Sequence, residues 1–127
     1  MLTFGTFFTA TYAQKIASSK VPAEVKLAFI KLHGSTKVSW EMEKLDYEAG
    51  FILNGKEASE VYSTTGLLLE SEVEIKVSEL PDAIRVKLKG IKITEAAKIT
   101  RASGGVLYEA RVGGKDLLFD AKGNAVK

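Results

Sequence analysis

The sequence predicts an α+β fold of two layers, in which two helices pack on one face of an antiparallel sheet. The main observation is that one order of patterns, a helix followed by four strands, occurs twice, at about residues 19–77 and 78–127. In addition, several strand patterns alternate apolar and charged residues, which is typical of a sheet with one buried face. We therefore predict tandem αββββ repeats.

The first repeat begins with a helix. Residues 14–20 are small and polar and are predicted to be a linker, with Ser19 as the helix N-cap and Pro22 in the first turn. Apolar residues then recur at helical spacing and stop before Gly34, which is a common signal for a helix end. The stripe predicted to face the sheet consists of Val21, Val25, Ala28, Phe29 and Leu32.

Four strands are predicted to follow this helix, at residues 37–44, 47–53, 56–62 and 67–77. Asn54 and Gly55 separate the second strand from the third and form a strong hairpin-turn signal. The order then restarts at residue 78.

The second repeat is predicted to follow the same order. Its helix carries Leu80, Ala83, Ile84 and Leu88 and stops at Gly90. The predicted strands are residues 91–101, 106–112, 116–119 and 125–127. Between the last two, Asp120 supplies a side-chain acceptor for a tight turn and Gly123 can take a positive φ.

The composition excludes several classes of protein. A length of 127 residues corresponds to one globular domain with a sizeable core. The net charge is +2 and the basic residues are scattered, so the chain lacks the clustered charge that nucleic-acid binding requires. With no cysteine, it can form neither a disulfide framework nor a thiolate zinc site.

The N-terminus predicts export. Residues 1–13 are uncharged and largely apolar, and the small residues Thr11 and Ala13 fit a signal-peptidase site. We expect a signal-peptide remnant at 1–13, a single domain at 14–127, and a periplasmic or secreted location. The alternative is an N-terminal strand or a disordered leader. The run is too short and too rich in threonine to span a bilayer, so stable membrane insertion is not expected.

No catalytic or metal-binding set is evident, and no cofactor is predicted. His33 is the only histidine, and its position at the end of a helix is explained by interaction with the helix dipole. Residues 120–124 resemble a calcium loop, but Lys122 occupies a ligand position and no closing glutamate follows. Paired glutamates can perform acid–base chemistry, yet alternating glutamates more often form a solvated strand face. An enzyme is therefore disfavoured.

The solvated sheet face is the candidate for partner binding, because alternation places one set of charged residues together on it. This set is Glu41, Glu43, Glu48, Glu72, Glu74, Glu109 and Arg111. Among the aromatic residues, Phe51, Tyr108 and Phe119 are predicted to be in the core, whereas Trp40 and Tyr62 can belong either to the core or to an interface.

Several short motifs occur along the chain, at Pro22, Pro81 and residues 40–41, 47–49, 55–57, 108–109, 114–116 and 119–124. These motifs resemble those of the PepSY-like proteins, a family also described as β-lactamase-inhibitor-like, whose members are small periplasmic or secreted bacterial proteins. The resemblance implies two tandem repeats, export and no enzymatic activity. The family's turn motif is altered in the first repeat, at residues 62–66.

Together these observations predict a non-catalytic exported protein that binds a protein partner through the exposed face of its sheet, as a monomer or weak dimer. One alternative is a binder of small ligands or peptides in the cleft between the repeats. The other is an enzyme of unfamiliar type.

Overall fold

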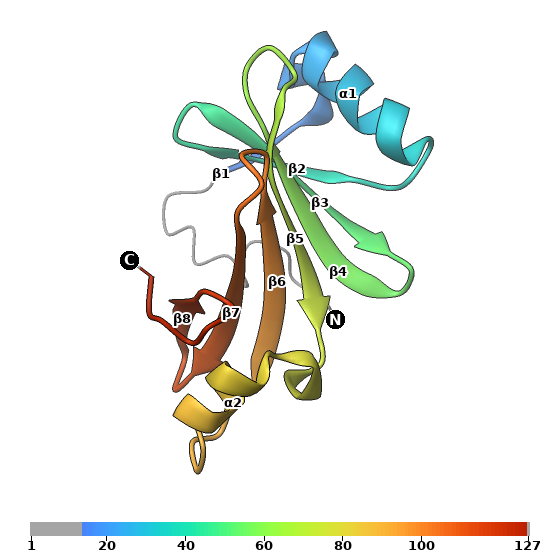
Figure 1. The fold of residues 1–127 in the computed structure, drawn as a ribbon. Helices are drawn as coiled ribbons and strands as arrows, with labels where there is room; N and C mark the ends of the chain where they lie inside the picture. The colour runs from blue at the N-terminus through green and yellow to red at the C-terminus, as the bar shows by residue number, and fades with distance from the viewer. Residues whose placement is uncertain (1–13, 127) are drawn as a thin grey trace. The chain divides into compact units, whose positions relative to one another are not determined.

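The computed structural model describes residues 14–126, which form two compact units divided between Ser71 and Glu72. Figure 1 shows the elements coloured by their order in the chain, from blue at the first strand to red at the last. The structure consists mostly of antiparallel strands, and the order of the eight strands in the sheet is their order in the sequence.

The first unit contains one long helix and the first strands. Its elements are β1 (Gln14–Ile16), a 3-10 turn (Ser18–Lys20), α1 (Ala23–His33), β2 (Ser39–Glu43), β3 (Asp46–Leu53) and β4 (Lys56–Tyr62). Strand β5 (Leu68–Ile75) begins in this unit and ends in the second. Within the unit, β1–β2, β2–β3 and β3–β4 pair antiparallel.

The second unit has less helix. It contains a 3-10 turn (Val77–Glu79), α2 (Asp82–Lys87), β6 (Glu95–Arg101), β7 (Val106–Val112) and β8 (Lys115–Phe119). Strands β6–β7 and β7–β8 pair antiparallel, and after β8 only an isolated bridge joins Phe119 to Ala125.

The predicted architecture of tandem αββββ repeats with two helices on one sheet face is wrong. Within residues 14–126 the sheet dominates, α1 is the one long helix, and α2 spans only 6 residues. The first half has an additional strand, β1, before its helix, whereas the described second half has three strands after α2. In the described part of the predicted strand at 125–127, a single bridge at Ala125 follows the turn at Asp120.

Several smaller predictions near α1 also need correction. Residues 14–20 are a strand and a 3-10 turn, where a linker was predicted. The N-cap of α1 is Pro22, not Ser19, and it makes no side-chain capping bond. Leu32 was predicted to be buried, but it is 58% exposed. The predicted signal peptide at 1–13 lies outside the described residues.

The core of the first unit is aromatic. Phe29 of α1 packs edge-on against Trp40 of β2 and Phe51 of β3, with ring centroids 5.8 and 5.1 Å apart. Tyr62 lies fully buried beside them. Val25, one turn before Phe29 on α1, is also buried in this core. Trp40 and Tyr62, whose placement the sequence left open, are therefore core residues, and the prediction for Phe51 is confirmed.

The core of the second unit forms around α2. Leu80, Ile84 and Leu88 pack with Ala96, Ala110 and Phe119, and the partly buried Tyr108 contacts this cluster. The core position predicted for Phe119 is therefore confirmed. Ala96 faces Ala110 across β6 and β7, and two small side chains at that point leave room for Ile84.

The turn predicted at 120–124 is present. Asp120 Oδ1 accepts hydrogen bonds from the backbone N–H groups of Lys122 and Asn124, each at 2.9 Å. These bonds lower the pKa of Asp120. Gly123 has a φ of +87° and lies so close to α2 that an added Cβ would be 3.1 Å from the Ala83 carbonyl oxygen. In the first unit, Gly66 approaches the carbonyl oxygen of Glu24 in α1 in a similar way, at 2.7 Å.

Candidate functional site

Three of the predicted site residues lie together in the first unit. Glu41 and Glu43 of β2 and Glu48 of β3 occupy the sheet face opposite to Trp40 and Phe51, because successive side chains alternate along each strand. Glu41 is directly opposite Glu48 in the β2–β3 register. We call Glu41, Glu43 and Glu48 the carboxylate face.

The exposure predicted for this face is wrong at its centre. Glu41 is 7% exposed and Glu48 is 3% exposed. One oxygen of each carboxylate, Oε1 of Glu41 and Oε2 of Glu48, is buried without a hydrogen-bond partner among the described residues. Two buried acidic groups that face each other in this way are poorly compensated, and the charge of Glu41 makes Glu48 harder to ionise.

The pKa values follow from this arrangement. Burial raises the pKa of Glu48 to about 8, and the negative charges of Glu43 and Glu41 add to the effect. The pKa of Glu43 is also raised. Burial is the largest cause, and the negative charge of Glu70 is the second. Glu48 is therefore largely protonated near neutral pH, and the carboxylate face carries fewer negative charges than a count of its glutamates suggests.

The other predicted site residues belong to strands that enter or lie in the second unit. Glu72 and Glu74 are on β5, and both Glu72 and Glu109 of β7 are buried rather than exposed. Glu109 and Arg111 share one face of β7 by alternation. The Arg111 guanidinium donates two hydrogen bonds to the Asp116 carboxylate, at 2.9 and 3.1 Å, and these bonds raise the pKa of Arg111.

A buried polar network under α1 was not predicted. His33 Nε2 lies 2.9 Å from both oxygens of the Glu60 carboxylate, and the Tyr62 hydroxyl donates to Glu60 Oε1 at 2.6 Å. The His33 ring packs on Phe29 and Phe51, with centroids 4.8 and 4.5 Å away. Burial and the bond to Glu60 raise the pKa of Tyr62. The signal for this network was Glu60 itself, a charged residue between Ala58 and Tyr62 on the apolar face of β4.

The hydrogen bonds of this network join its own three side chains. A histidine paired with a carboxylate acts in catalysis when a nucleophile or substrate atom lies beside it. Here the ring nitrogen Nε2 is used by Glu60, and the hydroxyl of Tyr62 is used by the same carboxylate. The described residues also contain no group of three or more ligand side chains placed to hold a metal ion. The His33–Glu60–Tyr62 network thus ties the end of α1 to β4.

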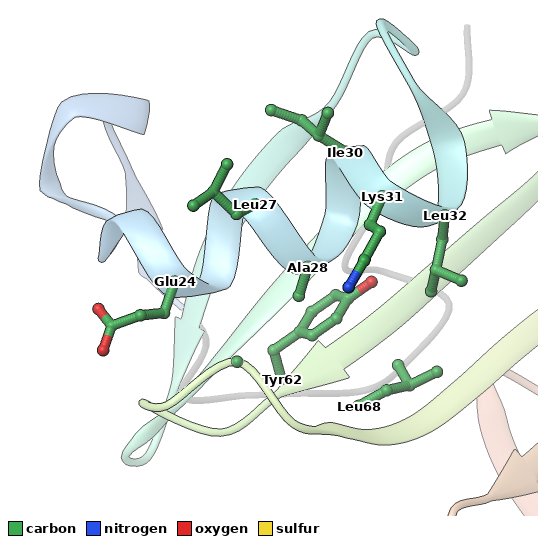
Figure 2. Close-up of a pocket in the computed structure, with 9 residues that line it drawn as sticks. Glu24, Leu27, Ala28, Ile30, Lys31, Leu32, Tyr62 and Leu68 are labelled. Carbon is green, nitrogen blue, oxygen red and sulfur yellow. The ribbon is translucent and has the colours of Figure 1, made fainter.

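A groove borders α1 in the first unit. It has a volume of about 720 Å³ and is formed by α1, by Tyr62 at the end of β4, and by Gly66 and Leu68 of the following turn. Figure 2 shows Ala28 and Leu68 pointing towards the Tyr62 ring, whereas Leu27 and Ile30 project from the opposite side of the helix. The groove is mainly apolar, and Glu24 and Lys31 provide its charged side chains.

Residues 14–126 include no helix with the length and apolar character needed to cross a membrane.

Comparisons with known proteins identify the fold. No family model matches the chain, and no curated protein matches it. Similar solved structures include a periplasmic protein from Bacteroides eggerthii, described as putative, with a TM-score of 0.76 at 17% identity over 84% of this chain and 86% of that one. A DUF2874 family protein from Bacteroides uniformis has a TM-score of 0.74 at 18% identity, with the same coverage of both chains. A BLIP-like protein from Bacteroides fragilis has a TM-score of 0.62 at 17% identity and covers 84% of both chains. The chain therefore shares the fold of these DUF2874 and BLIP-like structures.

Proposed function

We propose that this protein is an exported, non-catalytic member of the PepSY-like group and binds a protein partner through its carboxylate face. The periplasmic and BLIP-like descriptions of structures with the same fold support this proposal, as does the signal-like composition of residues 1–13. The proposed contact surface consists of Glu41, Glu43 and Glu48, with Glu72, Glu74, Glu109 and Arg111 as further members.

The observation that carries the proposal is the uncompensated pair formed by Glu41 and Glu48. The two carboxyl groups face each other across β2 and β3, and each has a buried oxygen without a partner. A lysine or arginine from a partner can form a charge-assisted hydrogen bond with the partly exposed Glu43 beside this pair, and its positive charge would favour the ionised form of Glu48. The partner that this face fits therefore presents a basic side chain.

Such a contact has a protonation signature. A cation next to Glu48 would lower its pKa, which is about 8 in the free protein. Near neutral pH the complex would thus release a proton from Glu48 when it forms. Calorimetry in two buffers with different ionisation enthalpies measures this release directly.

The test begins with capture of partners from a periplasmic extract by the chain from Gln14 onward. Glu43→Gln and Glu48→Gln keep the shape of each side chain and remove its charge, and Glu79→Gln in the exposed 3-10 turn before α2 is the matched control. We expect a partner that the native chain and the control retain, that both carboxylate-face variants lose, and that releases a proton on binding. A partner bound equally by all four proteins, or no partner, contradicts the proposal.

The alternative of small-ligand or peptide binding has a specific structural observation in its favour. The groove along α1 has the volume of a small-molecule site and an apolar lining. It lies within the first unit, so it differs from the cleft between repeats that the sequence suggested. Ligand screening by thermal shift, with Ala28→Phe to fill the groove beside Tyr62, tests this alternative: a stabilising ligand should lose its effect in the variant.

A further inference from the structure

The outward face of α1 is unusually apolar for an exposed helix. Leu27 is 63% exposed and Ile30 is 52% exposed, although the same helix buries Val25 and Phe29 on its inner side. Ala23, the first residue of α1, and Gly34, the C-cap that follows its last residue, are both exposed and continue the line at either end. The spacing of the four residues is four, three and four positions, which is the spacing of the seam between two packed helices.

This seam is symmetric about its own centre. Leu27 and Ile30 lie at equal distances from the middle of the line, and so do Ala23 and Gly34. If two copies of α1 pack antiparallel about a two-fold axis through that centre, Leu27 of each meets Ile30 of the other. The small residues then meet at both ends, where they let the two backbones approach closely.

The charges beside the seam are arranged almost symmetrically, because the midpoint between Glu24 and Lys31 lies one residue from the centre of the seam. Glu24 and Lys31 are both exposed and stand seven residues apart, or two helical turns, so they occupy one flank of α1 about 10 Å apart. In an antiparallel pair this flank faces its own copy running in the opposite direction. Glu24 of each chain is then beside Lys31 of the other, and two ion pairs flank the apolar centre.

From these observations we infer that α1 is a homodimer interface, with a second copy of this chain as the partner. The interface is antiparallel and isologous, and its centre is formed by Leu27 and Ile30. The charge pattern selects this arrangement because Glu24 and Lys31 on one flank complement each other only when the second helix runs in the opposite direction. The groove beside α1 extends the surface, since Leu27, Ile30 and Leu32 line it as well and Leu67 is exposed at the adjacent turn.

The dimer should be weak. A helix of 11 residues spans about 16 Å, so the contact is shorter than a typical stable interface. Association should therefore depend on concentration over the range from about 10 µM to about 1 mM. It should also weaken with added salt, because the two ion pairs lie at the exposed flank.

Sedimentation of the full chain, at increasing concentration, tests the inference. We expect Leu27→Glu and Ile30→Glu to weaken dimerisation by at least about tenfold, because each places two charges in the apolar centre. The control is Val86→Glu on α2, which changes a side chain that is 72% exposed and should leave dimerisation unaffected. Circular dichroism confirms that each variant remains folded.

A charge-exchange experiment tests the orientation of the helices. Glu24→Lys gives a wholly basic flank and Lys31→Glu a wholly acidic flank, so each variant alone should dimerise more weakly than the native chain. An equimolar mixture of the two should associate again, because each acidic position then faces a basic one. A native chain that stays monomeric at every concentration overturns the inference, as does a dimer that survives Ile30→Glu, or a mixture that fails to associate.

Discussion

Replacing Glu48 by glutamine should stabilise this protein and change how its stability depends on pH. Glu48 is 3% exposed, faces Glu41 across the sheet, and has its pKa raised to about 8 from an ordinary value of 4.5. Because the folded-state pKa is higher than the unfolded-state value, ionisation of Glu48 favours the unfolded chain. The side chain thus contributes most to stability below about pH 4.5, and this contribution is lost as the pH rises towards 8.

The size of the effect follows from the same values. The difference of 3.5 between about 8 and 4.5 corresponds to about 5 kcal/mol, at about 1.36 kcal/mol for each pKa unit. Water entry and side-chain relaxation reduce this upper limit, so we expect about 2–5 kcal/mol at pH 9. Glutamine stays neutral and fills a similar volume, and Glu48→Gln should therefore exceed the native protein in free energy of unfolding by this amount.

Urea unfolding at several values between about pH 4 and about pH 9 measures the effect. The two proteins should have similar stability at the acidic end and diverge as the pH rises. Glu95→Gln, at an exposed glutamate at the start of β6, provides the control and should parallel the native curve. If Glu48→Gln also follows the native curve at every pH, the reasoning from burial and charge repulsion is refuted.

Three further predictions concern local contacts. Glu60→Gln should cost about 1–3 kcal/mol in urea unfolding, because it weakens two hydrogen bonds in the network beneath α1; an unchanged midpoint would contradict this. Gly66→Ala should lower stability by about 1–3 kcal/mol more than Gly104→Ala. Both glycines have positive φ, but only at Gly66 does the new Cβ meet a backbone oxygen, 2.7 Å away, and equal thermal midpoints would count against this. The native protein should lose stability as the pH falls through the lowered pKa of Asp120, and Asp120→Asn should lose less over that range in thermal melts, since its turn bonds do not depend on ionisation.

The sequence predicted those parts of the fold that depend on neighbouring residues. The hairpin at Asn54 and Gly55 and strand β4 at Lys56–Tyr62 were predicted closely, because alternation and turn chemistry act over a few residues. The turn at Asp120 was also predicted correctly, since its acceptor and its glycine are both local. Strand β1 was missed because its three residues have no alternation of their own, and only pairing with β2 makes them a strand.

The candidate site was harder to predict for a different reason. Alternation assigns Glu41 and Glu48 to one sheet face, but it carries no information about what covers that face. The burial of both residues, and hence the raised pKa of Glu48, depends on the packed structure. Helical spacing failed similarly at Leu32, because α1 has apolar residues on nearly all sides and the pattern cannot identify the side that meets the sheet.

The strand order has a consequence for how this chain folds. In each unit the paired strands are consecutive in the sequence, so the β3–β4, β6–β7 and β7–β8 pairings join residues that are close along the chain. Proteins with such local contacts have a low contact order and fold quickly for a β-rich chain, because little loop entropy is lost before each hairpin forms. The β1–β2 pair is different, since its partners Ile16 and Trp40 enclose the whole of α1. We therefore expect the hairpins to form early and β1 to join its sheet last.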